Sequence, residues 1–404
     1  MMHVLVLVAW LIALAWVFKF AEAAAGFPRV PDLNRPRYDA APVGEPKVVA
    51  IVPARNEALG IGPCLLSLLG QDYRNLQIIA INDRSADETG AQMDEIARSA
   101  PGRLRVLHIT ELPDGWLGKT HAMAISAHEA IESLGAEYLL FTDGDVRFAP
   151  SAIRRSLAYA QSARADHFVL MPTMLAQTIG EGAVLSFLQT MSLWAVRPWR
   201  ASDPRAKRDA IGVGAFNLLR VTAYRQIGGF DATPMEVLED LYLGRRIKWA
   251  GLKQAVAIAP GMVEVHWAAG ARGIAHNMTK NIFAVFRFRP FLLLAAASSV
   301  ALSSIGPVVL ALFPATRLAG CITLFAAAGL YWISSKINRI SAAYVIFLPV
   351  AAALVVYAMV RSMMVTLRDG GITWRGTFYD LATLRRHMVA PPRRQTGRDA
   401  AGIR

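Results

Sequence analysis

Cysteine is scarce in this sequence, and its scarcity excludes several kinds of protein. The chain has two cysteines, Cys64 and Cys321, in apolar surroundings, with neither a CxxC pair nor a histidine at zinc-ligand spacing. A single pair cannot form a disulfide framework, and the spacing excludes a zinc finger. The two cysteines fit a reducing compartment.

Acidic residues are also few. The 404 residues include 30 Asp and Glu against 43 Lys and Arg, which gives a formal net charge of +13. Such a charge can indicate nucleic-acid binding, but the arginines gather near apolar segments and in residues 361–404. No recognition helix, zinc finger or RNA-binding motif accompanies them. A basic flank facing anionic lipid explains the charge better, so we expect a membrane and no nucleic acid as partner.

A dinucleotide-binding fingerprint is missing as well. No GxGxxG follows the first predicted strand. Gly60-Ile61-Gly62 lies several residues into the next helix, and Gly212-Val213-Gly214 does not open a helix of the required type. The sequence therefore disfavours a NAD-binding protein.

Long apolar runs, by contrast, are present at both ends of the chain. Residues 4–18 have no Lys or Arg before them, and the basic residues that follow are Lys19, Arg29, Arg35, Arg37 and Lys47. A signal peptide is the alternative, because residues 21–26 are rich in small side chains. The positive-inside rule favours an uncleaved anchor and a cytoplasmic domain after it. We therefore predict a multi-pass protein of the cell inner membrane.

Three apolar segments near the C-terminus are candidates for membrane crossing. Residues 291–314 and 343–360 are long enough to span a bilayer, and residues 318–334 are barely long enough. Three crossings would leave the Arg-rich tail outside, so a re-entrant segment or a shallow hairpin of two segments are alternatives. The sequence leaves the parity open. An apolar helix at about 181–196 fits a membrane-surface segment and a buried core helix equally well.

The middle of the chain alternates between short apolar runs and helical periods. The predicted strands and intervening helices are, in order, 47–52, 57–69, 76–82, 87–99, 104–109, 118–134 and 138–142. This βαβ series predicts an α/β fold with a mostly parallel sheet covered by helices. Ligands of such sheets bind beyond the carboxyl ends of the strands, where Pro53, Asn82 and Asp143 fall.

The most informative motif is Asp143-Gly144-Asp145, which follows a strand-like run. A carboxylate pair in this position can hold a divalent cation against a nucleotide diphosphate. Taken alone, Asp-x-Asp is a common surface turn. PARNE at 53–57 and NDRS at 82–85 each follow a strand, however, and Glu239-Asp240 comes later in the chain. The four sites together indicate sugar-nucleotide chemistry.

Six motifs between about Val48 and Gly251 resemble, as a set, those of the membrane-anchored family 2 glycosyltransferases. They are IVPARNE, INDRSADETG, GWLGKTHAM, LLFTDGDVRF, GAFNLLRVTAYRQIGGFD and EVLEDLYLGRRIK. The resemblance implies the GT-A fold, which is Rossmann-like with a mostly parallel sheet and helices on both faces, here with transmembrane helices at both ends. The apolar segments and the closing TWRGT at 373–377 resemble the hopanoid-associated and carotenoid glycosyltransferases. The processive signature QxxRW is missing after Glu264, which favours transfer of a single sugar.

The resemblance implies a nucleotide-binding role for six residues. Three of them, Pro53, Arg55 and Glu57, shape the pocket. Asp83 accepts a hydrogen bond from the base, normally uracil, whose imide N–H a carboxylate can take. Of the remaining two, Lys119 lies near the diphosphate and Asp143 near the ribose.

The same resemblance implies a divalent cation and a catalytic base. Mg²⁺ or Mn²⁺ would be held by Asp145 as the more direct ligand and by Asp143. Asp240, after Glu239 at a predicted helix start, takes the place of the base that inverting transfer needs on the side of the sugar opposite the leaving group. Acid pairs at helix N-termini also occur as plain dipole partners.

The acceptor side has weaker signals. Gly228-Gly229-Phe230-Asp231 resembles the acceptor-side loop of the family, although a simple turn explains the glycines nearly as well. His266, Trp267, His276 and Lys280 are candidates for the edge of the acceptor or diphosphate site, in a stretch where the chain departs from the family pattern.

The chain is thus expected to be an inverting, metal-dependent glycosyltransferase that moves one sugar from a UDP-sugar to a membrane lipid hydroxyl at the cytoplasmic face. A processive polysaccharide synthase and an inactive nucleotide-binding membrane scaffold are alternatives. The predicted regions are an N-terminal membrane anchor, a GT-A domain, an interfacial segment, a C-terminal transmembrane region and a basic cytoplasmic tail, at residues 1–21, 46–265, 266–290, 291–365 and 366–404.

Overall fold

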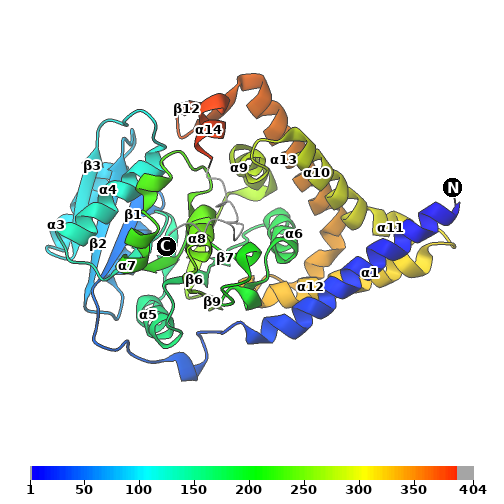
Figure 1. Ribbon diagram of the computed structural model, residues 1–404, viewed down its shortest axis with the longest axis horizontal. Helices are drawn as coiled ribbons and strands as arrows, with labels where there is room; N and C mark the ends of the chain where they lie inside the picture. Colours follow the sequence, from blue (N-terminus) through cyan, green and yellow to red (C-terminus); the bar gives the residue numbers. More distant parts are fainter. Residues whose placement is uncertain (1, 389–404) are drawn as a thin grey trace, which may run out of the picture.

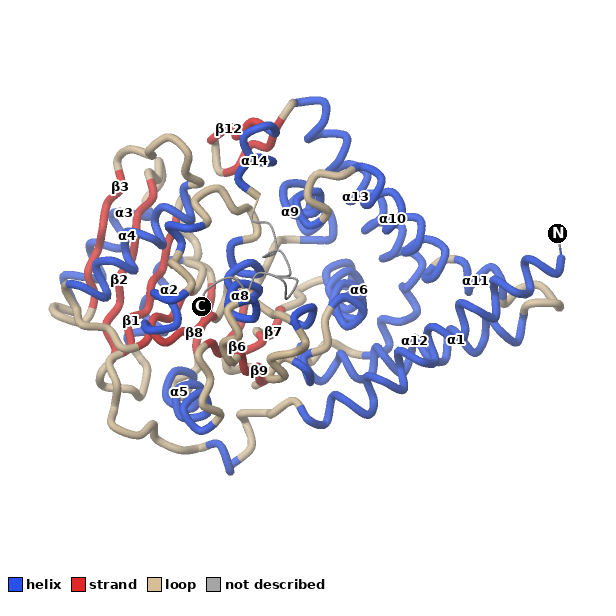
Figure 2. The backbone as a smooth tube through the Cα atoms, viewed as in Figure 1, coloured by secondary structure: helices blue, strands red, loops and turns tan. Residues whose placement is uncertain are grey.

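The computed structural model describes residues 2–388, with every side chain among them except that of Lys280. An α/β part and a group of long helices lie side by side, and the end of the helical group that includes the N-terminus projects away from the α/β part (Figure 1). Strands occupy the α/β part, and the projecting region consists of helices and their connections (Figure 2).

A seven-stranded sheet forms the centre of the α/β part, in the order β3-β2-β1-β4-β8-β6-β9. Its strands are β1 (Val48–Ala54), β2 (Leu76–Asp83), β3 (Leu104–Ile109), β4 (Tyr138–Phe141), β6 (His167–Met171), β8 (Asn217–Arg220) and β9 (Gln254–Ile258). The strand β8 is antiparallel to both neighbours, and the other pairs are parallel. The register pairs Ala54 with Asn82 and Ile51 with Phe141, so the carboxyl ends of β1, β2 and β4 meet at one edge.

Helices cover both faces of this sheet because alternate strand residues point to opposite sides. Val48, Ala50 and Val52 of β1 pack with α2 (Ile61–Leu69), α3 (Thr89–Ser99) and α5 (Ala152–Ser162). Val49 and Ile51 pack with α4 (Gly118–Glu132), α7 (Val221–Gln226) and α8 (Glu239–Trp249). All seven residues of β1 are buried, as expected of a central strand.

Two smaller sheets lie beyond the carboxyl edge. One joins β5 (Val146–Phe148), β10 (Val263–Val265) and β7 (Thr173–Met174), and it follows directly on Asp145. The other is a hairpin of β11 (Gly371–Trp374) and β12 (Thr377–Asp380), followed by α14 (Leu381–His387). Residues 371–388 of the predicted tail therefore form ordered structure, and residues 389–404 lie outside the described part of the chain.

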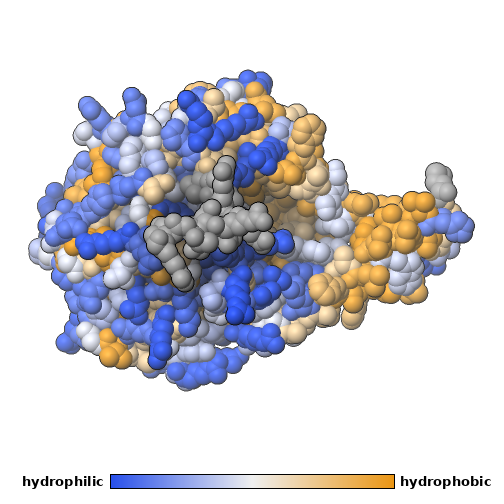
Figure 3. Space-filling view, viewed as in Figure 1, coloured by the Kyte–Doolittle hydropathy of each residue, from blue (hydrophilic) through white to orange (hydrophobic). Residues whose placement is uncertain are grey.

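The helices of this group are α1 (Met2–Gly26), α6 (Ile179–Ala195), α9 (Gly270–Val285), α10 (Pro290–Ser304), the short α11 (Gly306–Leu310), α12 (Arg317–Asn338) and α13 (Leu348–Asp369). Within residues 2–388, five helical stretches are long and apolar enough to cross a membrane. Four of them coincide with the segments that the sequence predicted at the two ends of the chain, except that the one predicted at 291–314 ends at Leu310. Hydrophobic side chains cover the projecting surface around α1 and α11, whereas hydrophilic side chains dominate the α/β part (Figure 3).

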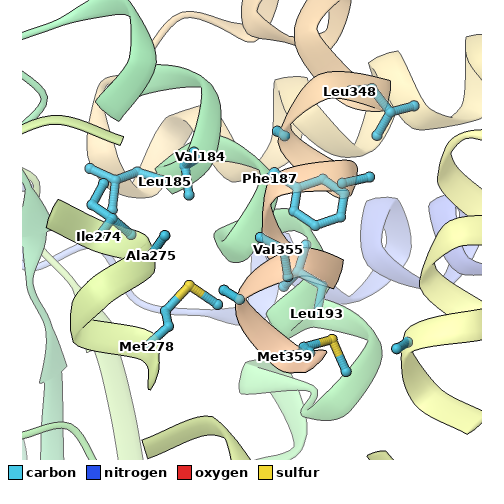
Figure 4. Packing of buried hydrophobic residues seen from close by; sticks show 14 of the residues in the cluster. Val184, Leu185, Phe187, Leu193, Ile274, Ala275, Met278, Leu348, Val355 and Met359 are labelled. Atoms are coloured by element: carbon cyan, nitrogen blue, oxygen red, sulfur yellow. The ribbon is translucent and has the colours of Figure 1, made fainter. Parts of the chain in front are cut away.

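Apolar side chains surround α6 on several sides. Phe187 and Leu193 of α6 lie among Met278 of α9 and Val355 and Met359 of α13 (Figure 4). Phe187 is fully buried, and so is most of the first half of the helix. The first half of α6 is therefore a buried helix that packs against α9 and α13, whereas residues 192, 194 and 195 in its second half are exposed.

The N-terminal helix α1 is packed against other helices over much of its length. Trp16 is 1% exposed and donates its indole N–H to the carbonyl of Ser303 at 3.0 Å. At its C-terminal end, Glu22 pairs with Lys19 at 2.8 Å and with Arg197 at 3.3 Å. The helix α1 thus contacts both the segment of Ser303 in α10 and the segment after α6.

The chain returns twice to the α/β part after its apolar segments. At the end of α12, the side chain of Asn338 accepts a hydrogen bond from the backbone N–H of Met174 at 3.0 Å. After α13, Arg375 pairs with Glu57 at 2.6 Å. Both ends of the segment that contains α13 therefore contact the α/β part.

Candidate active site

A cavity of about 740 Å³ opens at the carboxyl edge of the sheet. Seven residues that the sequence singled out line it: Arg55, Glu57, Lys119, Asp143, Asp145, His266 and Trp267. Five of them follow the ends of β1 and β4 or stand at the start of α4, as the βαβ pattern predicted. His266 and Trp267 come from the segment between β10 and α9, which brings the candidate acceptor edge into the same cavity.

Local packing fixes the acidic triplet after β4. The hydroxyl of Thr142 donates to the carbonyl of Ala215 at 2.8 Å, which ties the triplet to the loop before β8. Gly214 of that loop lies against Asp143, and a methyl group at position 214 would overlap the Asp143 carboxylate. A larger residue at position 214 would therefore displace the Asp143 carboxylate from the position that it has here.

Lys119 bridges two acidic motifs. Its ammonium lies 2.5 Å from Asp143 and 2.6 Å from Glu239. Burial opposes the charge on Lys119, but Asp143, Glu239 and Asp240 outweigh burial and hold the pKa of Lys119 above its usual range. The ammonium therefore remains charged at neutral pH and can bind a phosphate oxygen.

The carboxylate pair in the triplet carries excess negative charge. Burial, and then the charges of Asp143 and Glu57, raise the pKa of Asp145 to about 6. Two carboxylates in an open polar cavity are ligands that Mg²⁺ accepts, provided that water and phosphate oxygens complete the coordination. Within residues 2–388, no group of three or more His, Cys, Asp or Glu side chains could hold a metal by itself. The residues present fit a cation that binds together with a diphosphate.

Asp83 lies at the bottom of a smaller cavity, of about 30 Å³. Its carboxylate is 5% exposed and accepts two hydrogen bonds from Arg84, at 2.7 and 3.1 Å. Pro53 and Lys119 line the same cavity, and so do residues of the β11–β12 hairpin. Residues from four of the predicted nucleotide-binding motifs thus lie together, next to the larger cavity.

Positive charge accumulates beside Asp83. The Nη1 of Arg55 donates to the hydroxyl of Thr377 at 3.3 Å, and its Nε is buried without a hydrogen-bond partner among the described residues. Burial first, and then the neighbouring Arg84 and Arg375, hold the pKa of Arg55 below its usual range. Excess positive charge with an unsatisfied donor is the environment that an anionic ligand relieves.

Asp240 lies behind Lys119, at the start of α8. It lines a small cavity of about 10 Å³ that shares Lys119 and Asp143 with the large one. One carboxylate oxygen accepts the backbone N–H of Leu241 at 2.6 Å. Burial, and then the charge of Glu239, raise the pKa of Asp240 to about 7. A carboxylate with such a pKa is suited to accept a proton near neutral pH.

The remaining acceptor candidates lie elsewhere. Gly229 is in a turn with φ 56°, where Arg246 donates to its carbonyl at 2.6 Å, and it does not line the large cavity. Its neighbour Phe230 lines the small cavity of Asp240. His276 is exposed on α9, and the side chain of Lys280 lies outside the described part. Asn277 of the same helix does line the large cavity.

The sequence reasoning missed one residue that positions the acceptor edge. Glu181, 2% exposed, accepts hydrogen bonds from the backbone N–H groups of Gln177 at 2.7 Å and Gly270 at 2.6 Å. It also pairs with His266 at 3.1 Å. Thr178 caps α6, and its hydroxyl accepts a hydrogen bond from the Glu181 N–H at 3.2 Å. The sequence pattern T-x-x-E before an apolar run, which is typical of a capping box, could have drawn attention to Glu181.

The family described as "Glycosyltransferase like family 2" matches residues 46–284, more than half of the chain. The chain belongs to this glycosyltransferase family. The match includes the seven cavity-lining residues named above, and it identifies the α/β part as the glycosyltransferase domain of the chain. The mostly parallel sheet with helices on both faces is the GT-A-like fold that the sequence predicted.

One solved structure supports the fold of this glycosyltransferase. The mannosyltransferase PcManGT from Pyrobaculum calidifontis, in complex with GDP-Man and Mn²⁺, is 19% identical with a TM-score of 0.52, and the match covers 86% of this chain and 98% of that one. TarS 1–349 from S. aureus, in complex with UDP-GlcNAc, is 13% identical with a TM-score of 0.40 over 83% and 96% of the two chains. A search among curated proteins found no match.

Proposed function

We propose that this glycosyltransferase transfers a single sugar, with inversion and with Mg²⁺ or Mn²⁺, from a UDP-sugar to a lipid hydroxyl at the cytoplasmic face of the inner membrane. The observation that carries the proposal is the large cavity. It joins an acidic and basic cluster suited to a nucleotide diphosphate with Trp267 and α9, which pack against the apolar helices. A soluble donor and a lipid acceptor can meet only at such a boundary.

The donor half of the proposal rests on charge and position. Asp83 would accept the imide N–H of the base, and Arg55 with Lys119 would bind the diphosphate. PcManGT was solved with GDP-Man and Mn²⁺, which supports a nucleotide-sugar donor and a divalent cation in this fold. Asp145 and Asp143 would hold the cation, which when bound neutralises charge on the departing nucleoside diphosphate.

The reaction assigns the acceptor's proton to Asp240. The acceptor oxygen forms a bond to the anomeric carbon as the bond from that carbon to the diphosphate breaks. Asp240 takes the proton of the hydroxyl, and its raised pKa makes it a competent base. Lys119 would exchange Asp143 and Glu239 for the diphosphate, which opens the small cavity of Asp240 to the large one.

The proposed orientation rests on the two returns of the chain. Asn338 after α12 and Arg375 after α13 both contact the catalytic domain. The glycosyltransferase domain and the β11–β12 hairpin would therefore lie on the same side of the membrane in this proposal. The basic residues that follow α1 favour the cytoplasmic side.

The test is release of nucleoside diphosphate from a panel of UDP-, GDP- and dTDP-sugars. It uses the purified full chain with membrane lipid, with and without Mn²⁺ or Mg²⁺, and Asp145→Ala and Asp240→Asn as variants. We expect metal-dependent release that both variants lose, a product with one added sugar, and inversion at the anomeric carbon by NMR. Release that survives both substitutions contradicts the mechanism, longer products indicate a polymer synthase, and donor binding without turnover indicates a scaffold.

A further inference from the structure

The hairpin after α13 presents one face to the nucleotide site. Opposite residues in an antiparallel pair share a face, and β11 pairs Ile372 with Tyr379 and Trp374 with Thr377. Tyr379 is 8% exposed, whereas Phe378 of the opposite face is 53% exposed. The two-residue turn of Arg375 and Gly376 has φ values of 48° and 79°, the left-handed pair that a tight hairpin requires.

Four contacts fasten this face to the catalytic motifs. Arg55 donates to the Thr377 hydroxyl at 3.3 Å, and the backbone N–H of Gly118 donates to the Tyr379 hydroxyl at 3.3 Å. Arg375 donates to the Arg55 carbonyl at 3.0 Å and pairs with Glu57 at 2.6 Å. The hairpin therefore bridges the segment after β1 and the start of α4, the two segments that flank Asp83.

The size of the cavity above Asp83 shows what the hairpin does there. Trp374 and Tyr379 form its walls, and its volume is about 30 Å³. That volume holds water and not a nucleoside, because a site for a small ligand measures roughly 300–1,000 Å³. A base can reach Asp83 only if the two aromatic rings move aside and then lie against it. The adjoining cavity of about 740 Å³, which shares Trp374 and Arg375 as walls, has room for the rest of a donor.

We propose that the β11–β12 hairpin is a ligand-binding wall of the donor site, in which Trp374 and Tyr379 hold the nucleoside and Arg375 exchanges Glu57 for the donor's diphosphate. The proposal rests on the proposed function, because it presupposes a nucleotide donor. Aromatic rings bind nucleobases by stacking, and a guanidinium that leaves a carboxylate for a phosphate keeps a charge-assisted pair. The hairpin thereby makes the C-terminal segment a part of the donor site.

The test is binding of UDP and a UDP-sugar to the purified full chain by isothermal titration calorimetry, with Mn²⁺ present. Trp374→Ala should weaken binding by about 5- to 150-fold, the loss expected for one stacking contact. Arg375→Ala should weaken binding of UDP far more than of uridine, because the diphosphate is the part it contacts. Matched controls are Phe378→Ala on the opposite face and the exposed Arg368→Ala just before the hairpin, and both should bind as the unsubstituted chain does.

Two further measurements distinguish a loss of folding from a loss of binding. Trp374→Phe should regain most of the affinity, because a smaller ring still stacks, and thermal unfolding checks that each variant is folded. If the unsubstituted chain binds UDP and folded Trp374→Ala and Arg375→Ala bind it equally tightly, the hairpin has no such role. If the unsubstituted chain binds none of the nucleotides in the panel, the proposed function fails, and the hairpin proposal fails with it.

Discussion

Replacing Asp240 by Asn should abolish transfer and, at the same time, stabilise the folded chain at alkaline pH. The pKa of Asp240 is raised to about 7 in the folded protein by burial and by Glu239. In the unfolded chain it returns to its ordinary value, so between about pH 4 and 7 the folded state binds a proton that the unfolded state has lost. Stability therefore falls as pH rises through this window, and Asn, which carries no charge, avoids that loss.

The magnitude follows from the pKa difference. About three pKa units correspond to roughly 4 kcal/mol, and because Asp240 is half-buried and solvent screens part of the effect, about 1–2 kcal/mol is the expected share. That free energy raises the midpoint of thermal unfolding by about 2–8 °C for a domain of this size. The gain should be absent near pH 4 and complete above pH 7. Loss of a general base should lower the rate by about 10²- to 10⁴-fold.

The assay is thermal unfolding of the detergent-purified chain at pH 5, 6, 7 and 8, with nucleoside diphosphate release measured on the same samples. Asp114→Asn, at an exposed aspartate, is the control and should show no pH-dependent difference. An Asp240→Asn chain that unfolds no later than the unsubstituted chain at pH 8, or a difference that does not vary with pH, would refute the reasoning.

Three other substitutions test the packing around the site. Gly212→Ala should lower the free energy of unfolding by about 1–3 kcal/mol and lower activity, because its methyl group would overlap the backbone at the start of α8. Gly62→Ala is the control, because a methyl group has room there, and equal losses of stability in the two variants would contradict this. Lys119→Met should weaken UDP-sugar binding by about tenfold or more and destabilise the chain most at alkaline pH, where its carboxylate partners are charged; unchanged binding counts against a diphosphate contact. Trp16→Ala should lower stability in detergent by about 3–5 kcal/mol, and Trp10→Ala, 38% exposed on the same helix, much less; similar losses would mean that α1 is not packed as described.

The sheet could be predicted where local pattern and topology agree. The strand ends that carry Pro53, Asp83 and Asp143 follow apolar runs of ordinary length, and parallel pairing then brings them together without further information. The short strand β8 was not predicted, because its four residues, NLLR, show no alternation of apolar and polar side chains, and its antiparallel insertion between β4 and β6 depends on tertiary pairing.

Polar residues near its C-terminal end made one apolar helix appear shorter in the sequence than it is in the structure. The segment predicted at 318–334 extends to Asn338 as α12. Its last turns contain Ser334, which bonds with Thr190 at 3.0 Å, and Asn338, which bonds with the backbone of Met174. These hydrogen-bond partners satisfy the polar side chains inside the packed helices. The sequence shows only that the residues are polar, because their partners come from other parts of the chain.

The residues of the candidate site also fall into those that the sequence could place and those that it could not. Lys119, Asp143 and Asp145 could be placed from their motifs, because each stands at the end of an element whose direction the pattern gives. Trp374 and Tyr379 could not, because they follow the last membrane-type helix and approach Asp83 only through the tertiary fold. TWRGT was visible as a motif, but nothing local in it shows which cavity it faces.

The position of the hairpin sets an order for the making of the protein. A chain is synthesised from its N-terminus, and domains begin to fold as they emerge. The sheet and the acidic triplet are complete once residue 258 has appeared, but the wall that Tyr379 forms above Asp83 is added only after every apolar helix has been made. The α/β part of the nascent chain thus emerges from the ribosome without this wall of the Asp83 cavity, and the cavity closes last.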